Sequence, residues 1–116
     1  MSHVRALLLG LLAAAFLAAP ASASVLPAHG YYEGWDAKRN FVHFYYSAHK
    51  QMLVHVTIGG VLFGDYPVQG HQFHHKCIRH LCTRGQWTAN KHVSGIWNSS
   101  LQGVDVHFNA VWKGVG

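Results

Sequence analysis

The sequence predicts an all-β fold: a small antiparallel meander closing into a barrel or curled sheet, with a two-sheet β-sandwich as the alternative. Three observations support this fold class. Apolar and polar residues alternate in several segments, turn-forming residues interrupt the chain at intervals of about ten residues, and no stretch beyond residue 23 keeps a helical period. Closure is favoured because it hides the edges that aromatic-rich strands would expose.

Residues 1–23 have the pattern of a secretory signal peptide. A basic start leads into an apolar run over residues 6–19, and small residues follow at 21–23. The run is about 14 residues long, short of the roughly 20 that a helix needs to cross a bilayer. We therefore expect cleavage after Ala23 and export of a single domain over residues 24–116, secreted or periplasmic, with no integral membrane segment left.

Strands are expected from the alternating segments, in chain order. Residues 41–46 carry aromatics on both faces, and residues 52–58 place Val54 and Val56 on an apolar face opposite His55. Residues 86–89 and 93–97 indicate a hairpin about Asn90, and residues 104–112 form the clearest half-buried strand. Turn-forming residues at 38–40, 47–51, 59–60, 64–65, 67, 70, 90–91 and 98–103 imply seven or eight short strands.

Cys77 and Cys82 are expected to form a disulfide, because both would enter an oxidising compartment after export. The enclosed loop of residues 78–81 is short, so the bond would stabilise one hairpin and contribute little to the stability of the whole fold. As alternatives to a disulfide, the two cysteines could supply half of a metal site or form a redox centre. A structural zinc site needs a second ligand pair, however, and redox enzymes favour the C-x-x-C spacing.

The chain after residue 23 is basic, with eight Lys or Arg against four acids, a net charge near +4. The cations are scattered, with a mild concentration over residues 76–84. They indicate either a solvated surface or attraction to an anionic glycan, an acidic partner or a membrane surface. Specific nucleic-acid binding is not expected, since export removes the usual partner and no recognition motif is present.

Ten histidines follow residue 23, and they offer two candidate metal sites. His71, His74, His75 and His80 interleave with the two cysteines, and neutral imidazole is a common ligand of zinc and copper. No zinc-finger or metalloprotease spacing is met, so we expect exposed histidines that bind metal adventitiously and no required cofactor. His43, His55 and His107 would converge only if their strands are neighbours in register, which the sequence leaves open.

The aromatic residues separate into candidate core and candidate binding groups. Trp87, Trp97 and Trp112 lie in alternating segments and are expected in the core. Tyr31, Tyr32 and Trp35 lie in a glycine-flanked segment that we interpret as irregular, and they are the candidate binding surface, because Tyr and Trp are enriched at binding hot spots.

No set of residues predicts catalysis. The four acids lie in separate segments with no evident dyad, and the serines lack a nucleophile-elbow context. We therefore expect a binding or inhibitor module that recognises an extracytoplasmic protein or glycan. The alternatives are a histidine-rich metal-binding periplasmic protein and a small secreted toxin or bacteriocin-like factor.

Overall fold

Eight antiparallel strands form a closed barrel within residues 25–116, the part of the chain that this computed structural model describes, apart from the His75 side chain. Each strand pairs with the next and β8 pairs with β1, so the meander closes into a barrel and the sandwich is not adopted. The predicted signal peptide lies outside the described residues. The strands are β1 (Gly30–Asp36), β2 (Phe41–Ser47), β3 (Met52–Ile58), β4 (Val61–Gln69), β5 (Gln72–Ile78), β6 (Leu81–Ala89), β7 (His92–Ser99) and β8 (Val106–Gly114).

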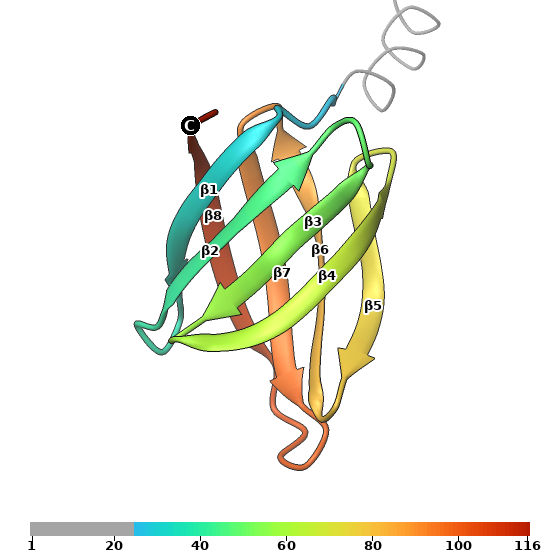
Figure 1. Cartoon of the computed structure of the whole chain (residues 1–116). Helices are drawn as coiled ribbons and strands as arrows, with labels where there is room; N and C mark the ends of the chain where they lie inside the picture. Colours follow the sequence, from blue (N-terminus) through green and yellow to red (C-terminus); the bar gives the residue numbers. More distant parts are fainter. Residues whose placement is uncertain (1–24) are drawn as a thin grey trace, which may run out of the picture.

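Figure 1 shows β2, β3 and β4 crossing in front of β6 and β7, with β1 and β8 beside each other. The tight turns after β2, β4 and β6 lie at one end of the barrel, together with residues 25–29 that lead into β1. We call this the N-terminal end. The opposite end, here the loop end, carries residues 37–40, the turns after β3 and β5, and the long loop over residues 100–105.

Side chains fill the interior, as expected for an eight-stranded barrel. In β2, for example, Val42, Phe44 and Tyr46 alternate inward. Trp87 is buried as predicted, while Trp97 and Trp112 are partly buried against the core. The other buried members of the cluster are Tyr32, Leu53, Val56, Ile58, Phe63, Tyr66, Val68, Phe73, Val93, Phe108 and Ala110.

The predicted alternation in residues 52–58 is wrong in its first half, because β3 contains a β-bulge. Leu53 is fully buried, whereas strict alternation with Val54 and Val56 predicts that it lies on the opposite, polar face together with His55. His55 has a left-handed φ of 54°, and the register with β4 shifts between Leu53 and Val56. The extra residue reverses which side chains face inward. The Asp65 carboxylate on β4 accepts the His55 backbone N–H at 2.8 Å, which gives the bulge a hydrogen-bond partner.

The turn predicted at residues 64–67 is also wrong, because β4 continues through Gly64 and Pro67. Proline is tolerated there because the ladder between β4 and β5 contains only two register pairs, Val68 with Phe73 and Gln69 with Gln72. Beyond them the two strands diverge toward the loop end, as Figure 1 shows. Ile78 closes this seam, since its Cδ1 occupies the space where a Cβ of Gly64 would lie.

Candidate binding surface

Two pairs of aromatic side chains lie on the outer face of β1 and β2. Tyr31 contacts Tyr45 edge-on with ring centroids 4.8 Å apart, and Trp35 contacts Phe41 at 5.2 Å. The pairs follow directly from the strand register, in which Tyr31 lies opposite Tyr45 and Trp35 opposite Phe41. Trp35 is 61% exposed and Tyr31 is 49% exposed, so the predicted exposure of both residues is confirmed. We call these four residues the aromatic face.

A polar row separates the two aromatic pairs. Glu33 lies opposite His43 in the β1–β2 register, and Thr57 of β3 extends the row beyond His43. On the other side of Glu33 the row ends at Val111 of β8, an exposed apolar residue. Each pair is also held by its neighbours: the Tyr45 hydroxyl lies 2.6 Å from His29 Nε2, and Phe41 contacts the His43 ring. The result is an ordered surface with two apolar patches and a polar centre.

Tyr32, the third residue of the predicted binding surface, is a core residue and the prediction is wrong for it. Its side chain is 0% exposed and stacks on Phe44. The segment is a strand with an unbroken register to β2, although its register with β8 shifts between Tyr31 and Tyr32, and adjacent tyrosines therefore point to opposite faces. The Tyr32 hydroxyl donates to the Ala28 carbonyl at 2.6 Å and accepts from Trp87 Nε1 at 2.9 Å. Burial raises the pKa of Tyr32, so the hydroxyl stays protonated and able to donate.

The histidines of the predicted metal cluster are spread along β5 and its two turns. His71 lies in the turn before β5 at the N-terminal end, and His80 lies in the turn after it at the loop end. A strand of this length separates them by about 20 Å. His74 Nε2 lies 2.9 Å from the Gln69 side-chain oxygen, and His80 Nδ1 lies 3.4 Å from the Ser100 hydroxyl. The side chain of His75 is outside the described part of the structure.

The second candidate metal site is not assembled either. His43 on β2 and His107 on β8 are separated by β1, and the His55 backbone lies in the β3 bulge. Within residues 25–116, leaving His75 aside, no three histidine, cysteine or acidic side chains are grouped so that they could hold one metal ion.

Asp36, at the end of β1, is a buried carboxylate that organises the loop end. It accepts hydrogen bonds from the backbone N–H groups of Lys38 and Asn40, from the Asn40 side-chain amide and from Trp97 Nε1, all at 2.8 to 2.9 Å. Burial by itself would raise the pKa of Asp36, but these donors outweigh it and lower the pKa below its ordinary value. Asp36 therefore stays ionised and joins the β1–β2 loop to β7.

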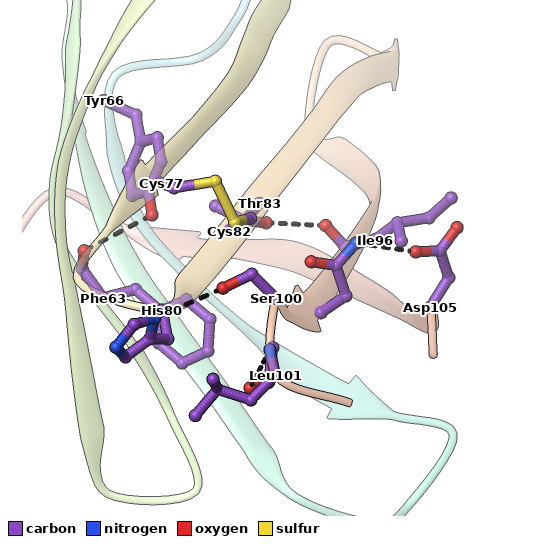
Figure 2. The surroundings of a disulfide bond; sticks show 12 residues. Phe63, Tyr66, Cys77, His80, Cys82, Thr83, Ile96, Ser100, Leu101 and Asp105 are labelled. Atoms are coloured by element: carbon purple, nitrogen blue, oxygen red, sulfur yellow. Dashed lines mark hydrogen bonds between the residues drawn. A yellow bond between two sulfur atoms is a disulfide. The ribbon is translucent and has the colours of Figure 1, made fainter. Parts of the chain in front are cut away.

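The predicted disulfide is present and joins Cys77 to Cys82 across the β5–β6 hairpin. The two residues are register partners one pair before the turn, with their Cα atoms 4.0 Å apart. Figure 2 shows its surroundings, where the Thr83 hydroxyl donates to the Ile96 carbonyl at 2.8 Å on the neighbouring strand. The disulfide therefore closes a hairpin that the β6–β7 ladder already holds in place.

Reducing this disulfide should cost the domain about 2 kcal/mol, because the closed loop contains so few residues. Urea unfolding of the oxidised and reduced protein, followed by tryptophan fluorescence, measures the difference. A Cys77→Ala/Cys82→Ala double variant is the control and should match the reduced protein with or without reductant. Loss of the cooperative unfolding transition on reduction would contradict the expectation that the disulfide stabilises only this hairpin.

A hollow of about 550 Å³ is open on the outer wall formed by β5, β6, β7 and β8. Gly85 and Gly95 are register partners at its centre, and on the inner side the Phe73 and Phe108 rings occupy the space that a Cβ at either glycine would need. Because neither glycine has a side chain, the wall approaches these rings closely and is sunken on the outside. The rim includes Gln72, Gln86, Ser94, Arg84, Ile96 and His107.

No protein-family model, curated protein or solved structure matches this chain. Within residues 25–116 no helix has the length and apolar character required to span a membrane. The surfaces described above are therefore the basis for a functional proposal.

Proposed function

We propose that the protein is an exported binding module that docks an extracytoplasmic protein on the aromatic face of β1 and β2. The observation that carries this proposal is the exposure of Trp35 and Tyr31 on a barrel whose other large aromatic side chains mostly fill the core. Trp and Tyr contribute most to affinity when a partner desolvates them, and here both lie on the outer face of β1, on either side of Glu33.

The edge-on pairing favours a protein partner. Rings held against a cross-strand neighbour lose little side-chain freedom when a partner covers them, which lowers the entropic cost of association. The polar row between the pairs supplies Glu33 and His43, which offer hydrogen bonds and charge to fix the orientation of a partner. Because the polar centre must meet polar groups of the partner while the aromatic pairs meet apolar ones, this surface favours a single orientation of the bound partner.

The N-terminal sequence supports export of this module. Residues 1–23 have the pattern of a secretory signal, and the Cys77–Cys82 disulfide is a bond that persists in oxidising compartments. The partner would then be a protein of the periplasm, the cell surface or the surrounding medium.

A comparison of two double variants tests the proposal. Immobilised protein covering residues 24–116 is incubated with the extracytoplasmic fraction of the producing culture, and captured proteins are quantified by mass spectrometry. We expect at least one protein that Tyr31→Ser/Trp35→Ser captures at least about tenfold less than wild type, since each hot-spot aromatic alone is worth about 2 kcal/mol or more. The matched control is Val61→Ser/Leu62→Ser, which removes two apolar residues of 49% and 58% exposure from β4.

The control variant should capture the same protein as wild type does. Circular dichroism and thermal unfolding establish that both variants remain folded. Equal capture by wild type and by the aromatic-face variant would overturn the proposal, and so would equal loss in both variants.

A further inference from the structure

We propose that the hollow on the wall of β5 to β8 is a binding site for an acidic saccharide, a glycan that carries carboxylate groups. This site is distinct from the aromatic face: β6 and β7 form its centre, and β8 separates it from β1. Its volume of about 550 Å³ falls within the range of small-molecule sites in proteins.

The rim combines side chains that suit a sugar's hydroxyl groups. Gln72, Gln86 and Ser94 are aligned across β5, β6 and β7 in consecutive register pairs. Each amide offers both a donor and an acceptor, and the serine hydroxyl does the same. Neighbouring hydroxyl groups of a sugar ring need this mixture, since each also donates and accepts.

A second row on the same wall adds charge and an apolar surface. Arg84 lies opposite Ile96, and Ile96 lies opposite His107 on β8. The Ile96 side chain and the glycine backbone at the centre give an apolar contact for the C–H face of a sugar ring. Arg84 provides a planar guanidinium that binds a carboxylate through two parallel hydrogen bonds.

The charges around the hollow favour an anionic ligand. Of the described residues that line it, none is acidic, and Arg84 is the only one that carries a permanent charge. Arg84 Nη2 lies 3.8 Å from the Asp105 carboxylate, and both side chains are about half exposed. Such an exposed, loosely spaced ion pair contributes little free energy, so a ligand carboxylate could replace Asp105 as the partner of Arg84.

Other anionic ligands fit the hollow less well. A phosphate group is usually held by several backbone N–H groups of a helix N-terminus or a glycine-rich loop, whereas the hollow lies on the face of a hydrogen-bonded sheet. A peptide that adds a strand requires a free sheet edge, and β6 and β7 are paired on both sides. The single arginine among neutral polar side chains therefore points to a ligand with many hydroxyl groups and few charges.

Titration calorimetry with defined saccharides tests the inference. The probes are tetramers of galacturonate and of mannuronate, each compared with its methyl ester, which keeps the sugar and removes the charge. We expect at least one acidic tetramer to bind with a Kd below about 1 mM, and its methyl ester to bind about tenfold more weakly. Arg84→Gln should weaken the acidic tetramer to the level of the ester, while Lys113→Gln, which removes a cation elsewhere on β8, should not.

A second pair of variants tests the position of the site. Ser94→Trp should abolish binding because the indole fills the hollow, and Val61→Trp on β4 should not change it. The inference is overturned if neither acidic tetramer binds, if acid and ester bind equally, if Arg84→Gln binds like wild type, or if equimolar sulfate displaces the saccharide. Tyr31→Ser/Trp35→Ser should keep full saccharide binding, so failure of the aromatic-face proposal and failure of this one are distinguishable.

Discussion

Replacing Trp87 with alanine should lower the free energy of unfolding by about 4 kcal/mol, because it removes the largest fully buried side chain of the barrel. The Trp87 ring contacts Tyr46 at a centroid distance of 5.0 Å and also meets Tyr32 and Phe73. For a domain of this length the total stability is on the order of 5 to 9 kcal/mol, so the variant should retain only about 1 to 5 kcal/mol and unfold at a much lower urea concentration. Urea unfolding monitored by circular dichroism measures the loss.

The matched control is Trp35→Ala, which removes the same side chain from the exposed aromatic face and should cost less than about 1 kcal/mol. Tyr32→Phe should cost about 1 to 2 kcal/mol, because it removes the acceptor of the Trp87 Nε1–H inside the core. Trp87→Phe combined with Tyr32→Phe should cost less than the sum of the two single changes, since they break the same hydrogen bond. Additive costs would show that this hydrogen bond contributes nothing measurable.

The fold was predictable because its determinants are local. In an antiparallel meander each strand pairs with its neighbours in the chain, so alternation and turn spacing carry most of the topology. The β6–β7 hairpin and the Cys77–Cys82 disulfide follow from residues close together in the sequence. Closure of β8 on β1 is a long-range event, and it was expected only on the general ground that an open sheet would leave edges exposed.

The errors lie where a long-range partner decides the local structure. The bulge at His55 has its hydrogen-bond partner in Asp65 on the next strand, and the alternation of apolar residues around His55 contains no sign of it. The sequence predicts a break at Pro67, but β4 tolerates this proline because its ladder with β5 is so short. The periodicity of a sequence indicates the average alternation of a strand, but it does not indicate where the strand has a bulge or accommodates a proline.

Half of the candidate surface was found from the sequence. Trp35 and Tyr31 were identified, but the opposing Phe41 and Tyr45 depend on the β1–β2 register. Strict alternation through residues 30–36 would have placed Tyr31 and Tyr32 on opposite faces, and the flanking glycines obscured that signal. The hollow could not be predicted, because it requires Gly85 and Gly95 to be register partners above Phe73 and Phe108.

Replacing Asp36 with alanine should lower the free energy of unfolding by about 3 kcal/mol, the second largest effect that we expect from a single change. The carboxylate accepts four hydrogen bonds, and hydrogen bonds to a charged group contribute more than neutral ones. Without it the partly buried Trp97 Nε1–H loses its acceptor, while the backbone N–H groups of the β1–β2 loop regain water. Urea unfolding at neutral pH measures the loss, and Asp105→Ala, an exposed acid, should cost less than about 1 kcal/mol.

The same carboxylate should make stability depend on pH. Because the pKa of Asp36 is lower in the folded protein than in the unfolded chain, the unfolded chain binds the proton more readily. The contribution of Asp36 is therefore fully present above the ordinary aspartate pKa of about 3.9 and is lost as the pH falls through the lower, folded-state value. Acid unfolding should consequently be less steep in Asp36→Asn than in wild type. A steeper or equal slope in Asp36→Asn would mean that other acids control acid unfolding and that the loop end does not depend on an ionised Asp36.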